Sequence, residues 1–232
     1  MKEHLFAKLF SNPKYKEDFL NGKIYMCSLG YFKDLELTQG TKGDPLEGIG
    51  SYLQSNQVEI DIEYKGERHR VTGATGAITF ENHGHRYLKV FCLYSPELDL
   101  TNTNGVLNNI QPTEEMIKDF GRELIWIYNV SEFKRRIETA LKKNENIKKY
   151  EYRHVEYYSD NHHGIFTDSD IPFKKHEKFV FQKEFRIVLK TNDESTSSFV
   201  LNIGDIRDIC IEMRSADFNE GEFKIEINEQ KN

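Results

Sequence analysis

The chain has 232 residues, of which 38% are hydrophobic and 30% are charged, and its formal net charge is −6. This acidic balance argues against a protein that binds bulk nucleic acid, because such proteins gain affinity from an excess of basic side chains. No segment approaches the roughly 20 apolar residues of a membrane-spanning helix, and no glycine- or serine-rich linker divides residues 1–232, which we predict to form one domain.

The first third of the chain is predicted to place a helix between two strands. Residues 4–10 form an apolar run around a single cation, Lys8, and predict the first strand. A helix follows, with Pro13 at its first position. Residues 23–32 predict a second strand that closes near its glycine. Residues 33–50 are polar and rich in glycine, and we expect them to form a surface loop over one end of the sheet.

Alternating and continuous apolar runs predict more strands in the middle of the chain. Residues 58–64 alternate between apolar and acidic side chains, and Lys65–Gly66 then predict a turn into a return strand. Helices are predicted for residues 113–121 and for the segment that begins at Ser131. Further strands are predicted for residues 77–80, 87–95 and 124–130.

The last third of the chain contains five more strand candidates: HVEYYS, KFVFQKEFRIVLK, SFVLNIG, DICIEMR and FKIEIN. Strands outnumber helices, and they do not alternate with helices as a doubly wound parallel sheet requires. The predicted fold class is therefore α+β, with a mixed, largely antiparallel sheet. We further expect the strand of Lys8, residues 23–32 and residues 178–189 to share one sheet.

Residues 178–189, KFVFQKEFRIVL, place Lys183, Glu184 and Arg186 within a strand that is otherwise largely apolar after Lys178. Side chains two apart in a strand share a face, so Gln182, Glu184 and Arg186 are expected to line one polar stripe. Such a stripe suits the wall of a cleft, in which Arg186 could hold a phosphate and Glu184 a ribose. It suits equally well a solvated face with a ladder of cross-strand ion pairs. The sequence leaves both interpretations open.

Other candidate motifs are less specific. Asp44 and Glu47, in GDPLEG, either bind a ligand or shape a turn. No phosphate-binding glycine motif or nucleophile elbow occurs, and the histidines lack the spacing of a metal site, so no metal is expected. The cysteines are odd in number, and each lies in an apolar run, so we expect them to be free and mostly buried in a reducing compartment. They are Cys27, Cys92 and Cys210.

Several segments resemble an uncharacterised family of bacterial and phage proteins: LFAKLF, GKIYMCSLGYFKDLE, KGDPLEG, QKEFRI and LNIGDIRDI. The resemblance covers residues 5–48 well and the rest of the chain thinly. The order of these segments is also similar to the ADP-ribosyltransferase fold. In that fold an early strand carries a basic residue, a second strand carries a serine, threonine or aromatic residue, and a late strand carries the catalytic glutamate.

The resemblance implies an NAD-dependent ADP-ribosyltransferase-like protein of a bacterial or phage toxin, defence or host-takeover system, acting in the cytoplasm, or in the host cytoplasm if a phage encodes it. Glu184 would be the catalytic carboxylate, which stabilises positive charge on the ribose as nicotinamide leaves. Tyr31 and Phe32 either stack on the nicotinamide or pack in the core. The substrate-binding residues implied are Lys8 or His4, Ser28, Tyr31, Gln182 and Arg186.

The alternative is a non-catalytic phage or bacterial binding protein on the same scaffold, which sequesters a nucleotide or caps a protein partner. The two hypotheses differ at Glu184. A transferase needs this carboxylate to face an open cleft within reach of Tyr31 and Lys8. A binding protein tolerates its pairing with Arg186 or Lys183 at the surface.

Overall fold

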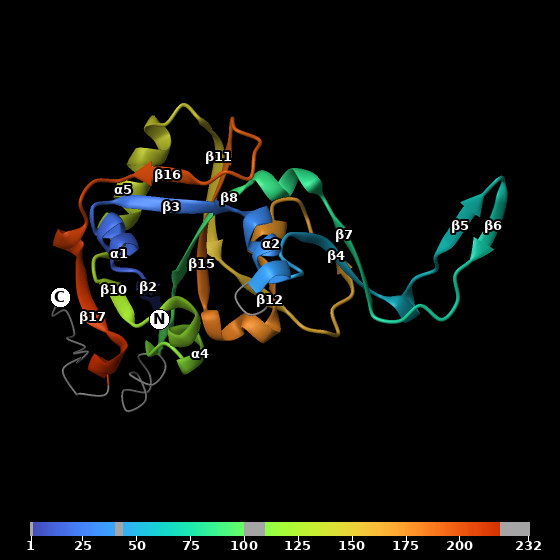
Figure 1. The fold of residues 1–232 in the computed structure, drawn as a ribbon, viewed down its shortest axis with the longest axis horizontal. Helices are drawn as coiled ribbons and strands as arrows, with labels where there is room; N and C mark the ends of the chain where they lie inside the picture. Colours follow the sequence, from blue (N-terminus) through green and yellow to red (C-terminus); the bar gives the residue numbers. More distant parts are fainter. Residues whose placement is uncertain (1, 40–43, 100–109, 219–232) are drawn as a thin grey trace, which may run out of the picture.

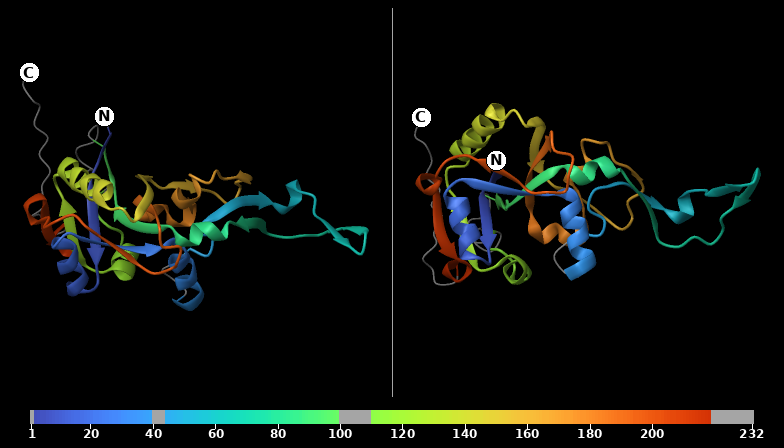
Figure 2. Two further views of the ribbon diagram at one scale, coloured as in Figure 1. Left: turned by 90° about the horizontal axis from the view of Figure 1, so that it is seen from above. Right: turned by 45° about the horizontal axis from the view of Figure 1, so that its top comes forward.

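The structure, a computed structural model, describes residues 2–39, 44–99 and 110–218. A large sheet carries a few helices, and a thin two-stranded arm extends from one side of the body (Figures 1 and 2). The predicted fold class, α+β with largely antiparallel strands, is confirmed. No helix in the described ranges is long and apolar enough to cross a membrane.

The main sheet has eight strands. Six follow the order β11-β15-β8-β2-β10-β17, and β3 pairs with β8 and β16. All of these pairings are antiparallel. The strand of Lys8, the strand that begins at Lys23 and the strand of Glu184 share this sheet, as predicted. The strands are β2 (Phe6–Phe10), β3 (Lys23–Ser28), β8 (Lys89–Tyr94), β10 (Glu123–Ile127), β11 (Ile147–His154), β15 (Glu184–Thr191), β16 (Phe199–Asn202) and β17 (Cys210–Arg214).

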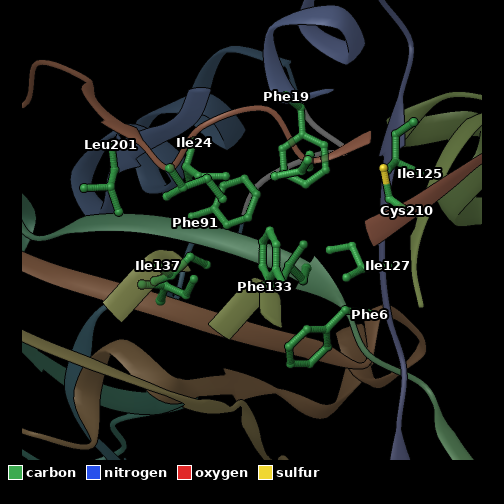
Figure 3. Packing of buried hydrophobic residues seen from close by; sticks show 14 of the residues in the cluster. Phe6, Phe19, Ile24, Phe91, Ile125, Ile127, Phe133, Ile137, Leu201 and Cys210 are labelled. Carbon is green, nitrogen blue, oxygen red and sulfur yellow. The ribbon is translucent and has the colours of Figure 1, made fainter. Parts of the chain in front are cut away.

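Helices cover both faces of this sheet. Alternate side chains of a strand point to opposite faces, so β2 sends Phe6 and Phe10 to one core and Ala7 and Leu9 to another. The first core lies against α1 (Pro13–Leu20) and α5 (Val130–Lys143), and Figure 3 shows Phe133 of α5 within it. The second core lies against α4 (Glu114–Phe120).

The second predicted strand is shorter than expected, because its end turns into a helix. Strand β3 stops at Ser28, and α2 (Leu29–Gln39) begins at once. The Ser28 hydroxyl accepts a hydrogen bond from the backbone N–H of Tyr31 at 3.0 Å, which satisfies one free donor of the first helical turn. The prediction that residues 33–50 form a loop is therefore wrong for the part up to Gln39, and also for Ile49 and Gly50, which begin strand β4 (Ile49–Gln54). Residues 40–43 lie outside the described residues.

The late predicted strand also begins later than its sequence indicated. Residues Glu177–Gln182 form a short 3-10 helix, and β15 starts only at Glu184. Lys183 joins the two with a φ of 40°, in the left-handed region that side-chain-bearing residues rarely adopt. Gln182 and Glu184 therefore do not lie on one face of one strand, and the predicted polar stripe is reduced to Glu184 and Arg186.

A second, smaller sheet forms the base of the arm. It has three strands in the order β13-β4-β7, with bounds Gly164–Ile165, Ile49–Gln54 and Ala77–Glu81. Beyond it, β5 (Asp61–Tyr64) and β6 (Glu67–Arg70) pair as a hairpin far from the body (Figure 1). The predicted turn at Lys65–Gly66 is confirmed, with φ values of 51° and 86°. Two successive positive φ values are typical of a type I′ hairpin turn.

Short elements complete the fold. Strands β12 (Glu156–Tyr158) and β14 (Lys174–His176) form a parallel pair, and β1 (Lys2–His4) pairs with β9 (Glu97–Asp99). Of the predicted strands, FKIEIN lies outside the described residues. The three cysteines are free as expected, but only Cys210 is buried, whereas Cys27 and Cys92 are half-buried. Further 3-10 helices span Ser55–Gln57, His83–Tyr87, Ile171–Phe173, Arg207–Ile209 and Ser215–Phe218.

Candidate functional site

The most unusual cluster of side chains in the structure is a buried ion network around Arg186. This residue is only 2% exposed, although it carries a full positive charge. Its Nη1 and Nη2 atoms donate hydrogen bonds to the two carboxylate oxygens of Glu47 at 2.7 and 3.0 Å, and its Nε donates to Glu184 Oε2 at 2.7 Å. Nη1 also donates to the carbonyl of Pro172 at 2.8 Å. Such a two-pronged contact is the geometry that a planar guanidinium favours.

Lys175 completes the network from the other side of Glu184. Its Nζ donates to Glu184 Oε1 at 2.5 Å and to the side-chain oxygen of Gln182 at 2.6 Å. The backbone N–H of Glu184 donates to the hydroxyl of Tyr157 at 3.0 Å. Both carboxylate oxygens of Glu184 are therefore engaged by cations, and the residue is 7% exposed.

The pleat of β15 explains why these charges lie together. Phe185 and Ile187 point into the main core, so Glu184 and Arg186 point to the opposite face of the strand. On that face they are covered by β14 with Lys175 and by the turn that precedes β4. The strand lies between the edge strand β11 and β8, so both of its backbone edges are paired. Both sequence-based interpretations of the stripe are therefore corrected: it is neither solvated nor open as a cleft.

The charges of the network hold one another in the ionised state. Burial alone raises the pKa of Glu184, but the charges of Arg186 and Lys175 hold it far below its usual range. Burial alone lowers the pKa of Arg186, but Glu184 and Glu47 raise it well above its usual value. Two carboxylates and two cations thus balance in the interior, which is the condition under which buried charges are tolerated.

Asp44 adds a carboxyl group of different character beside the network. Its Oδ1 accepts a hydrogen bond from the backbone N–H of Leu46 at 2.9 Å, which is the turn chemistry that its sequence context indicated. Its Oδ2 is buried and has no hydrogen-bond partner among the described residues. Burial and the neighbouring charge of Glu47 raise the pKa of Asp44. Glu47, by contrast, is a member of the ion network and more than a turn residue.

The other predicted substrate-binding residues make their contacts elsewhere. Ser28 is buried and caps α2. Tyr31 lies on α2, is 46% exposed, and contacts the ring of Phe32 edge-on at 5.8 Å. His4 lies against the ring of His154, with centroids 4.0 Å apart. The structure thus brings Gln182, Glu184 and Arg186 into one cluster. Ser28 and Tyr31 form no hydrogen bond with the described residues of that cluster.

Lys8 lies at the point where strand β8 changes its pairing partner in the main sheet. Strand β8 pairs with β2 at Tyr94 and with β3 at Val90, so its middle section changes partners. The Nζ of Lys8 donates to the carbonyl of Cys92 in this section at 2.8 Å and lies 4.9 Å from the ring centre of Phe91. Burial lowers the pKa of Lys8, which the nearby charge of Glu184 partly opposes.

Sequence reasoning missed Lys175 as a member of the network. It lies in the run FKKHEK, whose charges have the pattern of a solvated segment. No local signal separates it from Lys174, which pairs with exposed Glu156 instead. Comparison of the chain with protein-family models, with curated proteins and with solved structures gave no match.

Proposed function

We propose that the protein binds a partner protein through its arm, residues 55–76. The observation that supports this proposal is the hairpin at the end of the arm, in which every residue of β5 and β6 is exposed. Two large apolar side chains, Ile62 and Tyr64, lie in this hairpin and are more than half exposed. Ile62 and Tyr64 are two apart in β5 and therefore share one face of the hairpin, and exposed apolar side chains that lie together mark protein interaction sites.

The arm is held by contacts within itself. Arg70 donates to Asp61 from Nε at 2.5 Å and forms an ion pair with Glu59 at 2.9 Å. The backbone N–H of Val71 donates to the carbonyl of Ile60 at 2.8 Å. Within the ranges that the structure describes, the hydrogen bonds and ion pairs of the arm all lie inside it. An isolated two-stranded hairpin is marginally stable in water, so a partner that covers it adds stability.

The two faces of the hairpin differ in chemistry. Side chains opposite each other in an antiparallel pair share a face. The register pairs Asp61 with Arg70 and Glu63 with Arg68, so one face carries opposite charges side by side, and Arg70 hydrogen-bonds to Asp61 across it. The other face carries Ile62 opposite His69 and Tyr64 opposite Glu67. We assign the partner contact to this second face, because aromatic and aliphatic side chains supply most of the energy at protein interfaces.

Photo-crosslinking tests this function. A photoreactive phenylalanine replaces Tyr64 in the full chain, and the same residue replaces Tyr15 as the control, because both tyrosines are 63% exposed. In cells that make the protein, we expect one discrete adduct with another protein from position 64 and none from position 15. That partner, once purified, should bind the Ile62→Asp variant at least ten times more weakly than wild type. Equal labelling from both positions, or no adduct from position 64, would overturn the proposal.

A second candidate function is NAD-dependent chemistry at Glu184. It is favoured by the cluster in which Lys175 contacts Gln182 and Glu184, and Arg186 contacts Glu184. Because both oxygens of Glu184 accept hydrogen bonds from cations, NAD would have to displace Lys175 or Arg186 to reach this carboxylate. Calorimetric titration of the full chain with NAD, together with an assay for nicotinamide release, tests this candidate. If millimolar NAD gives no heat of binding and no release of nicotinamide, this candidate function is excluded.

A further inference from the structure

The second observation that points to a partner is the outer edge of β7, which belongs to the base of the arm and not to the hairpin. In the three-stranded sheet, β7 is an edge strand: within the described ranges it pairs with β4 alone. Its sequence, AITFE, contains strand-forming residues and has no charge or proline before its last position. Natural proteins usually protect such an edge, because its unpaired backbone groups attract another strand.

The backbone geometry of β7 shows which groups are available. The N–H of Phe80 points toward β4, where it donates to the Ser51 hydroxyl at 3.1 Å. In an antiparallel ladder the N–H and C=O groups of successive residues point to opposite sides. The backbone groups of Thr79, and of Ala77 two residues before it, therefore point outward from the sheet edge. Thr79 and Ala77 are both exposed.

One face of this small sheet is largely apolar. The register places Ile165 and Phe80 on either side of Ser51, and it places Leu53 opposite Ile78. Paired residues share a face, and Ser51 and Leu53 are two apart in β4, so all of them lie on the same side of the sheet. Phe80 is 63% exposed and Ile165 is 80% exposed. Tyr52 points to the other side and is buried against the body.

From these observations we propose that β7 pairs antiparallel with β7 of a second copy of this chain, with the two-fold axis at Thr79. A second copy is the occupant because the strand is complementary to itself in this register. Thr79 faces Thr79 of the second copy, and each Ile78 faces Phe80 of the other chain. Aromatic with β-branched pairs and threonine with threonine pairs are among the favourable cross-strand pairs.

The hydrogen bonding of this arrangement agrees with the free groups of β7. Thr79 and its counterpart form the hydrogen-bonded pair at the axis, which uses the outward backbone groups of both strands. Ile78 and Phe80 then form the non-hydrogen-bonded pairs, in which side chains approach most closely. The two small sheets join into one sheet of six strands, whose apolar face contains Leu53 and Ile165 from both copies. The pairing is isologous, which is the commonest form of contact between identical chains.

The dimer is independent of the partner contact proposed for the hairpin. The two-fold axis reverses the direction of β7, so the arms of the two copies extend in opposite directions. Each arm keeps its own hairpin turn at Lys65–Gly66, and the contact surface lies at the base of the arm. A failure of the dimer would leave hairpin binding intact, and a failure of hairpin binding would leave the dimer intact.

Cysteine crosslinking of the full chain tests the register. Thr79→Cys places two thiols at the axis, where paired Cα atoms of a hydrogen-bonded pair are about 5.5 Å apart, within the range of a disulfide. Ala77→Cys is the matched control, because Ala77 faces Glu81 of the other copy and its own counterpart is about 14 Å away at 3.4 Å per residue. We expect a covalent dimer from Thr79→Cys under mild oxidation, and only the background of wild type from Ala77→Cys.

Sedimentation measures the dimer without any crosslink. Thr79→Pro removes the outward N–H donor and leaves the inward bond of Phe80 in place, so it should weaken the dimer at least tenfold with the monomer still folded. Ile62→Lys, a substitution on the hairpin away from β7, should leave the dimer unaffected. Far-UV circular dichroism confirms that each variant is folded. A wild-type protein that stays monomeric at 100 μM, or equal crosslinking from positions 77 and 79, would overturn the proposal.

Discussion

Replacing Glu184 by glutamine removes one negative charge from the buried network and changes its shape very little. In wild type, Glu184 accepts hydrogen bonds from Lys175 at 2.5 Å and from Arg186 at 2.7 Å. After the substitution, Arg186 keeps its contact with the carboxylate of Glu47, whereas Lys175 keeps only the neutral side-chain oxygen of Gln182 and loses its charged partner. The amide NH2 group of the glutamine also takes the place of one of the two oxygens, and there it faces either Lys175 or Arg186, each of which is itself a donor.

The expected loss of stability is large. Removing one partner of a buried ion pair costs about 3–5 kcal/mol, because the remaining charge is left without compensation in the interior. The sequence alone predicts a stability within about 1 kcal/mol of wild type, as for a nearly isosteric substitution that leaves packing intact. The two values are far enough apart to be decided by measurement, since a domain is stabilised by about 5–15 kcal/mol in total.

Urea unfolding followed by far-UV circular dichroism measures this difference. The control is Glu67→Gln, because the Glu67 side chain is 81% exposed in the arm, and we expect it to change the free energy of unfolding by about 0.5 kcal/mol or less. Adding Lys175→Met to Glu184→Gln restores the charge balance, so the double variant should be less destabilised than the sum of the two single variants. A Glu184→Gln variant within about 1 kcal/mol of wild type would refute the account of the network.

Two further predictions follow from the perturbed groups. The pKa of Glu184 lies far below the value of about 4.3 in an unfolded chain, so the stability that this carboxylate contributes is complete above about pH 5 and is lost as the pH falls below 4.3. The difference in unfolding free energy between wild type and Glu184→Gln should therefore shrink between pH 7 and pH 3. A constant difference would contradict this. Burial raises the pKa of Cys92 to about 12 and that of Cys210 to about 11, so iodoacetamide at pH 7.5 should label both slowly in the native protein and quickly in guanidinium. Rapid labelling of both Cys92 and Cys210 in the native protein would contradict the burial of these two thiols.

The candidate site was only partly predictable. The sequence identified Glu184, Arg186 and Gln182 because their spacing is that of one strand face, and it singled out Glu47 within a glycine-rich turn. It did not predict that Glu47 and Arg186, which are 139 positions apart, form a two-pronged ion pair. The spacing of charges along a strand is the same whether the strand faces water or another segment of the chain. Burial depends on what covers that face, which no local pattern records.

The sequence by itself determined the features that depend only on interactions between neighbouring residues. The side chain of Asn12 caps the helix that begins at Pro13, and Lys65–Gly66 form the turn of the arm, because capping and turn conformations depend on adjacent residues. Strand alternation determined the two cores on either side of β2. The tertiary structure decided where β15 starts, because Lys183 adopts a left-handed conformation that places Gln182 beside Lys175. It also decided the state of Glu184, since the free energy of a buried charge is set by partners that arrive from distant segments.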